Sequence, residues 1–81
     1  MDTIGQRLEA VRRRRLMTQA ALAQAAGVAL ITVTRLENAD EGANPRPDTV
    51  KKLARALDVD PAWLLFGEDD DEMGKAAPVA A

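Results

Sequence analysis

Apolar residues recur at helical spacing along the first 67 residues, which predicts a chain built from helices. Near the N-terminus Ile4, Leu8 and Val11 lie at positions i, i+4 and i+7, so they share one face of a helix. This helix is predicted to begin at about residue 6 or earlier and to end at about residue 15. Thr3 is its candidate N-cap, because a threonine hydroxyl can accept from an unpaired backbone N–H of the first turn.

The same helical spacing returns after a loop in the second half of the chain. Residues 39–47, ADEGANPRP, have no period and include one glycine and two prolines, so a loop is predicted there. A helix is predicted beyond Pro47. Asp60 and Pro61 suit the N-cap and first position of a last short helix, which ends at Gly67. The periodic apolar positions after Pro47 are Val50, Leu53, Ala54 and Leu57.

Residues 19–38, QAALAQAAGVALITVTRLEN, have the pattern of two short helices joined by a tight turn. Thr18 is predicted to cap the first of them. Gly27 can adopt a positive φ, which ends a helix sharply, and the small side chain of Ala23 lets the two helices approach. This pattern is a helix-turn-helix, whose second helix, about 29–38, projects from the body and fits the major groove of B-DNA. The predicted inward positions are Leu22, Ala23, Ala26, Val28, Val33 and Leu36.

The chain is therefore predicted to be all-α, with a five-helix domain over residues 1–67 and a disordered acidic tail over residues 68–81. The tail, EDDDEMGKAAPVAA, holds too few apolar side chains to offset the entropy cost of ordering. Two roles stay open for it. It is either a solubilising segment or a tethered polyanion that competes with DNA for the basic face of the domain.

Charge divides the chain at the same point. The whole chain has a net charge of −2, with 11 basic and 13 acidic residues. Residues 68–81 hold five acidic residues and one lysine, so residues 1–67 hold ten basic and eight acidic residues. Four of these basic residues are consecutive, Arg12 to Arg15. The domain is therefore mildly basic, which suits a polyanionic partner despite the negative total.

Composition argues against several chemistries. The chain has no cysteine and no histidine, so it lacks thiolate metal ligands, disulfides and the commonest general base. No catalytic constellation is recognisable, and we predict a protein that is not an enzyme and needs no metal or cofactor. No apolar run approaches the roughly 20 residues that span a bilayer, and the N-terminus is not that of an exported protein. A cytoplasmic protein without membrane contact is predicted.

Four stretches, in this order and spacing, resemble the phage repressor/Cro group of helix-turn-helix regulators, also called the xenobiotic-response-element family. They are IGQRLEAVRRRR, TQAALAQAAGV, TVTRLEN and VKKLARALDVDPAWLLFG, and they cover residues 3–67. The resemblance implies a lambda-repressor-like fold. It also implies a sequence-specific regulator, more often a repressor, that binds a palindromic operator in double-stranded DNA as a homodimer.

The resemblance assigns roles to residues outside the base-contacting surface. Arg12 and Glu37 occupy positions where family members hold an ion pair between the first and third helices, and we expect its role to be structural. Gln19 matches a glutamine that contacts a phosphate, and Asn38 matches a phosphate-contacting residue at the end of the third helix. Arg46 is similar to an arginine that approaches a narrowed minor groove.

The third helix is expected to contact bases through its first exposed turn and the turn beyond. Leu30 and Ile31 stand where polar side chains are common, and neither can hydrogen-bond a base edge. They can pack against thymine methyl groups, whereas Arg35 would supply a polar contact, most naturally to guanine. The alternative is that Leu30 and Ile31 form a protein interface. The predicted base-contacting positions are Ala29, Leu30, Ile31, Thr34 and Arg35.

The loop after the third helix is a second departure from the family pattern. It holds Asp40 and Glu41, which would repel phosphates where relatives are often basic. Lys51 and Lys52, with the arginines of residues 13–15, are candidates to restore the attraction, although that run also suits an ordinary solvated helix end. A second function therefore stays open. The domain could be an antitoxin-like or antirepressor module that binds a protein partner through the third helix and does not contact DNA.

The most apolar patch of the chain lies just before Gly67. Trp63 and Leu64 are interpreted as closing the core. The patch consists of residues 63–66, and a five-helix monomer need not bury all four of them. Aromatic residues are also favoured at protein interfaces. The candidates for a homodimer interface are Trp63, Leu65 and Phe66.

Overall fold

The structure is a computed structural model that describes residues 3–39 and 45–67. Within these two ranges the chain forms five helices and no strands, which confirms the all-α, five-helix prediction. The expectations for Asp40, Glu41 and the tail at residues 68–81 lie outside the described residues. The helices are α1 (Ile4–Arg14), α2 (Gln19–Ala26), α3 (Leu30–Asn38), α4 (Pro47–Leu57) and α5 (Pro61–Phe66).

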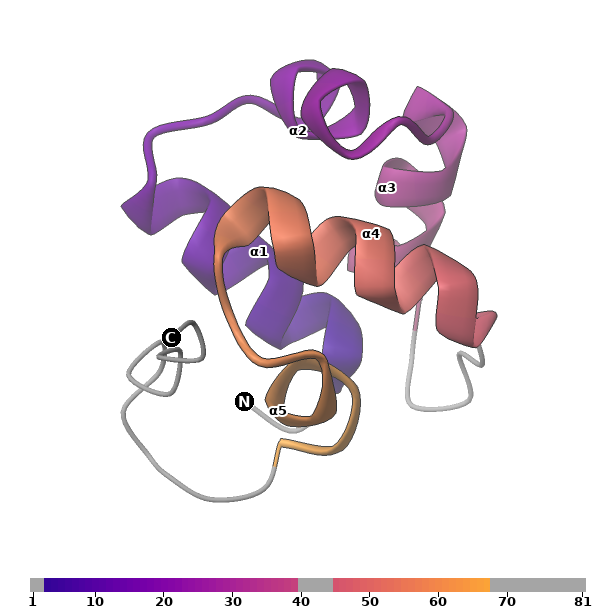
Figure 1. Ribbon diagram of the computed structural model, residues 1–81. Helices are drawn as coiled ribbons and strands as arrows, with labels where there is room; N and C mark the ends of the chain where they lie inside the picture. The colour runs from indigo at the N-terminus through magenta and orange to yellow at the C-terminus, as the bar shows by residue number, and fades with distance from the viewer. Residues whose placement is uncertain (1–2, 40–44, 68–81) are drawn as a thin grey trace.

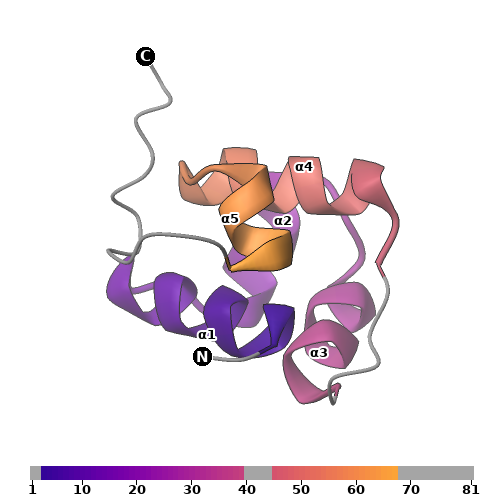
Figure 2. The same ribbon diagram turned by 90° about the horizontal axis from the view of Figure 1, so that it is seen from below.

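The helices enclose one core and leave α3 at an edge of the molecule. Helix α1 packs against α3 and α5, and α2 packs against α3 and α4 (Figure 1). Helix α5 lies between α1 and α4 and closes the side of the bundle away from α2. In the view from below, α3 lies at the periphery beside the start of α1 (Figure 2). This arrangement gives α3 one buried face and one face open to a partner.

Local side-chain hydrogen bonds begin three of the helices where the sequence predicts. The Thr18 hydroxyl accepts from the Ala21 N–H at 2.9 Å, and a carboxylate oxygen of Asp60 accepts from the Ala62 N–H at 2.9 Å. The Thr3 hydroxyl accepts from the Gln6 N–H at 3.0 Å, and the Gln6 side chain accepts in return from the Thr3 N–H at 3.3 Å. This reciprocal capping box begins α1 at Ile4, at the early end of the predicted range.

Left-handed residues end several helices. Gly27 has φ +74°, and the Val28 N–H then donates to the Ala23 carbonyl at 3.0 Å, as expected for the tight turn between α2 and α3. Leu16 and Asp58 are also left-handed and follow the ends of α1 and α4, with φ of 57° and 61°, although neither is a glycine. Leu16 is also 93% exposed, so the turn between α1 and α2 places an apolar side chain in water.

The core draws buried side chains from all five helices. The largest fully buried side chains are those of Leu8, Leu22, Val33, Leu53, Leu57 and Leu64. Of the inward positions predicted for α2 and α3, Ala26 and Val28 are only half-buried, and the other four are buried. Trp63 is also buried in this core, with 7% of its surface exposed.

Arg7 holds the short helix α5 against α1. Its guanidinium is buried, and Nε donates to the Leu64 carbonyl at 2.9 Å while Nη2 donates to the Leu65 carbonyl at 2.8 Å. These carbonyls lie in the last turn of α5, where a helix leaves backbone oxygens without partners and favours a positive charge. A six-residue helix is marginal on its own, so this contact and the burial of Trp63 and Leu64 stabilise it.

Candidate nucleic-acid interface

Of the predicted base-contacting positions, Ala29, Leu30, Ile31 and Arg35 are exposed at the start and on the outer face of α3, whereas Thr34 is half-buried. Residues 30, 31, 34 and 35 are spaced so that the first pair lies one turn before the second. Leu30 is 49% exposed and Ile31 is 52% exposed. Ala29 is the N-cap residue of α3, with an extended backbone, and Arg35 is exposed one turn after Ile31. The second helix of the helix-turn-helix thus presents a continuous surface that begins at its N-terminus.

An ion pair fastens the other end of α3 to α1. Arg12 Nε donates to Glu37 Oε2 at 2.7 Å, and Arg12 Nη2 donates to Glu37 Oε1 at 2.9 Å. The two side chains are 11% and 3% exposed, so solvent screens them little. Arg12 Nη1 also donates to the Met17 carbonyl at 2.8 Å, beyond the end of α1. The structure therefore brings together the pair that the family resemblance implies.

The hydrogen bond with Glu37 is the main reason that the pKa of Arg12 is raised above its ordinary value, and the negative charge of Glu37 adds to it. A cation whose pKa is raised on folding stabilises the folded state below its unfolded pKa, and that contribution is lost only as the pH rises through the folded pKa. The stabilisation from charged Arg12 is therefore constant across neutral pH.

Gln19 and Thr34 extend this ion pair into a network across three helices. Gln19 Nε2 donates to Glu37 Oε1 at 2.9 Å, and the Thr34 hydroxyl donates to Gln19 Oε1 at 3.1 Å. We call the set Arg12, Glu37, Gln19 and Thr34 the interhelical network. The sequence assigns Gln19 to a phosphate and Thr34 to a base, but it gives no sign that the two are bonded to each other. Both side chains hold α2 and α3 in register.

Gly5 is a structural residue that the sequence analysis missed. A methyl group on Gly5 would overlap the carbonyl oxygen of Leu36 and lie 3.1 Å from its carbonyl carbon. Helix α1 therefore lies directly against the backbone of α3, one residue before Glu37. The available signal was a glycine between Ile4 and Leu8 on the inward face of a predicted helix, where it otherwise costs stability.

The cations predicted to contact phosphate lie on the exposed surface. Arg46 is the exposed N-cap residue of α4, and Lys51 and Lys52 are exposed in the first half of that helix. Asn38 is exposed at the end of α3. The side chain of Arg35 is exposed and makes no hydrogen bond or ion pair with residues 3–39 and 45–67.

The arginines of residues 12–15 differ in their contacts and exposure. Arg12 belongs to the interhelical network, whereas Arg13 Nη2 lies 2.8 Å from Glu9 Oε2 in an exposed pair one turn apart on α1. Such an exposed pair contributes about 0.3–0.5 kcal/mol. Arg15 is the C-cap residue of α1 and is exposed.

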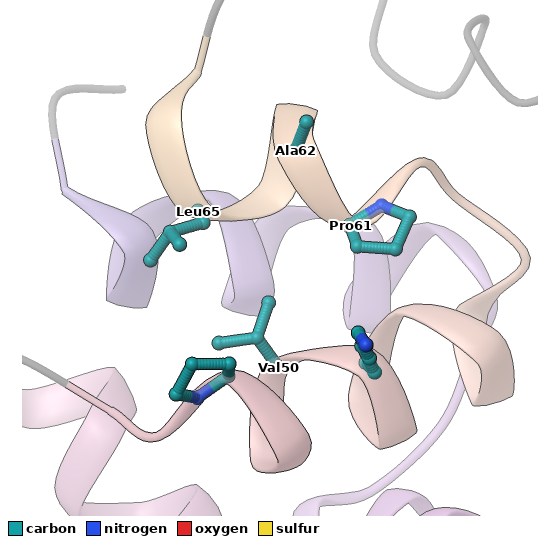
Figure 3. A pocket seen from close by; sticks show the side chains of 6 residues that line it. Val50, Pro61, Ala62 and Leu65 are labelled. Atoms are coloured by element: carbon teal, nitrogen blue, oxygen red, sulfur yellow. The ribbon is translucent and has the colours of Figure 1, made fainter.

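An apolar groove lies between α4 and α5 (Figure 3). Its volume is about 180 Å³, and Leu65 of α5 faces Val50 of α4 across it. Phe66, the next residue, is 68% exposed. The predicted dimer residues therefore separate: Trp63 is part of the monomer core, whereas Leu65 lines the groove and Phe66 lies in water. The groove is lined by Pro47, Val50, Lys51, Pro61, Ala62 and Leu65.

Among residues 3–39 and 45–67, no three acidic side chains come together in a way that could hold a metal ion. None of the described helices is both long and apolar enough to cross a membrane.

This geometry is that of a helix-turn-helix domain, and the chain belongs to the helix-turn-helix family, whose sequence profile matches residues 8–64. It is similar to the HTH-type transcriptional repressor RghR of Bacillus subtilis (strain 168), with 38% identity over 66 residues. The match takes in 82% of this chain and 48% of RghR. The chain spans about half the length of the curated relatives it matches.

Solved structures with the same fold include the P22 c2 repressor in complex with synthetic operator 9T, with a TM-score of 0.73 and 28% identity. That match covers 84% of this chain and 100% of the repressor chain. A chain of the SinR protein/SinI protein complex matches with a TM-score of 0.71 and 32% identity, over 78% of this chain and 60% of that one. The repressor-like fold expected from the sequence is confirmed.

Proposed function

We propose that this protein is a sequence-specific DNA-binding transcriptional regulator, a repressor in its simplest form, with α3 in the major groove of its operator. The observation that carries the proposal is the exposed face of α3, held in place by the interhelical network at its far end. A groove-binding helix has to be rigid relative to the rest of the domain, because its side chains must meet base edges in register.

The comparisons support the same function. RghR is named a transcriptional repressor, and the P22 c2 repressor is seen with an operator. The proposed action is occupancy of DNA, which needs neither catalysis nor a cofactor. A cytoplasmic location is part of the proposal, because bacterial operators are found there.

We propose that the protein binds its operator as a homodimer. A single domain makes few phosphate contacts, whereas two domains on a palindrome contact half-sites about one helical turn, roughly 34 Å, apart. The apolar groove and the exposed Phe66, which follows Leu65 at the end of α5, are the surface that we assign to the second copy. Burying an exposed phenylalanine in an apolar groove is favourable, and aromatic side chains are enriched at the centres of interfaces.

Selection of bound sequences from random duplex DNA tests this function. The bait is the chain of residues 1–81 at about 100 mM salt, where phosphate contacts still contribute. The expected result is an enriched palindrome. Arg35→Ala should then lose preference at a base pair in each half-site. Arg55→Ala is the matched control, because it removes an equal charge from the exposed last turn of α4.

A second candidate function is a protein-interaction module of the same fold. The apolar pair Leu30 and Ile31 favours it, as does the similarity to a chain of the SinR protein/SinI protein complex. In that case Leu30→Ser should abolish binding of the protein partner, and Arg35→Ala should have no effect on it. The random-duplex selection would yield no enriched sequence from folded protein.

A further inference from the structure

The two exposed side chains that begin α3, Leu30 and Ile31, offer a DNA partner apolar contact. Leu30 and Ile31 carry no hydrogen-bonding group in their side chains, and about half of each side chain is exposed. Ala29, which precedes them, has a methyl side chain. A base pair that faces Leu30 and Ile31 therefore contacts apolar side chains.

The interhelical network engages the donor of the next polar side chain along this surface. Thr34 lies one turn after Leu30, and its hydroxyl hydrogen is donated to Gln19 Oε1 at 3.1 Å. Gln19 is in turn bonded to Glu37 at 2.9 Å, so its amide is oriented by the ion pair behind it. Arg35 is an exposed donor on α3, one turn away from the apolar pair.

The major groove presents one apolar group at base edges, the C5-methyl group of a pyrimidine. In ordinary DNA that group belongs to thymine. The same methyl group at the same position occurs on 5-methylcytosine. The two bases differ at position 4, where thymine has a carbonyl oxygen that accepts and cytosine has an amino group that donates. Discriminating between them needs a polar side chain.

We infer that Leu30 and Ile31 form a site for the C5-methyl group of a pyrimidine, and that this site does not distinguish thymine from 5-methylcytosine. The inference rests on the proposed function and adds the chemical group that α3 recognises. A T·A pair facing Leu30 and Ile31 is then replaceable by a methylated C·G pair, although the sequence has changed. Methylation of cytosine would create a binding site where the unmethylated sequence is not one.

The experiment uses the operator enriched from random DNA and the protein of residues 1–81. Each thymine of a half-site is replaced in turn by uracil, by cytosine and by 5-methylcytosine, with guanine opposite the last two. Dissociation constants are measured by fluorescence anisotropy. At the thymines that face α3, uracil and cytosine should each weaken binding about fourfold per methyl group lost, and 5-methylcytosine should bind within twofold of thymine.

Variants connect the effect to the named residues. Leu30→Ala together with Ile31→Ala should bind thymine and uracil duplexes equally, because the methyl group no longer has a partner. Both side chains are exposed, and circular dichroism checks that the variant remains folded. Arg35→Ala is the matched control on the same helix. It should weaken binding to every duplex and keep the thymine-to-uracil ratio.

Failure of the methyl site and failure of the proposed function give different results. Equal binding of thymine and uracil duplexes, on an operator that the protein does select, would overturn the methyl site and leave the proposed function intact. Loss of binding on 5-methylcytosine as severe as on cytosine would also overturn it, since a polar group of thymine would then be recognised. If no operator is selected by folded protein, both the proposed function and the methyl site are wrong.

Discussion

Leu16 ends α1 in a conformation that its side chain disfavours. A non-glycine residue in the left-handed region costs about 1–2 kcal/mol, and Leu16 gains nothing from burial because it is 93% exposed. Leu16→Gly should therefore raise the free energy of unfolding by about 0.5–1 kcal/mol, after the greater freedom of glycine in the unfolded chain is subtracted. Urea unfolding measures the change.

The control for this prediction is the neighbouring residue. Arg15 has φ −91°, which any residue adopts, so Arg15→Gly should lower the free energy of unfolding. If both glycines have the same effect, the stabilisation does not come from the left-handed backbone.

Glu37 balances the buried charge of Arg12. Glu37→Ala would leave the Arg12 guanidinium and the Gln19 amide without their shared acceptor, and the cost should be about 3 kcal/mol or more. The double variant Arg12→Leu with Glu37→Leu should lose less than the sum of the two single changes, because no charge is left buried. Additive losses in urea unfolding would show that the pair is not coupled.

At the scale of the helices, Gly5 reverses the usual effect of a glycine-to-alanine change. Helix propensity alone predicts a gain of up to about 1 kcal/mol for Gly5→Ala, the second residue of α1. The added methyl group would instead overlap the Leu36 carbonyl oxygen, so we expect a net loss of about 1–3 kcal/mol as α1 and α3 move apart. Thermal unfolding by circular dichroism gives the sign, and a gain in stability would contradict the close helix contact.

Arg7 and Trp63 make the docking of α5 measurable. Trp63 is the single tryptophan of the chain and is 7% exposed, so its fluorescence reports whether α5 is docked. Arg7→Met keeps the apolar stem but removes both hydrogen bonds to α5. We expect a red-shifted emission and a loss of about 3 kcal/mol for two charge-assisted bonds. Unchanged emission together with unchanged stability would show that α5 does not need this contact.

The elements that could be predicted are those determined by nearby residues. The caps Thr3, Thr18 and Asp60 act on N–H groups two or three residues away, so they are visible in the sequence. Arg7 acts on carbonyls 57 and 58 residues away, and nothing in its neighbourhood indicates this. The same limit explains the hydrogen bond between Gln19 and Thr34. Its two partners are recognisable separately, but their contact depends on how α2 crosses α3.

At the scale of the whole molecule, dimerisation should depend on Phe66. Phe66→Ser removes the exposed aromatic side chain that follows the groove residue Leu65, and we expect the dimer dissociation constant to rise about tenfold or more. Operator affinity should fall with it, while the sequence preference of α3 is unchanged. Analytical ultracentrifugation and operator titration measure the two effects.

A matched change elsewhere tests whether the effect is specific to this surface. Leu16→Ser removes another exposed apolar side chain, at the turn after α1. It should leave the dimer dissociation constant unchanged. A loss of dimer in both variants would indicate general apolar association instead of a defined interface.

The interhelical network also bears on how new specificities can arise in this chain. The side chains that position α3 are Arg12, Glu37, Gln19 and Thr34, whereas Leu30, Ile31 and Arg35 point outward and contribute little to the core. Mutations at the outward positions are therefore nearly neutral for folding, and they are free to accumulate as an operator drifts. A lineage carrying this domain can exchange one target sequence for another without passing through unstable intermediates.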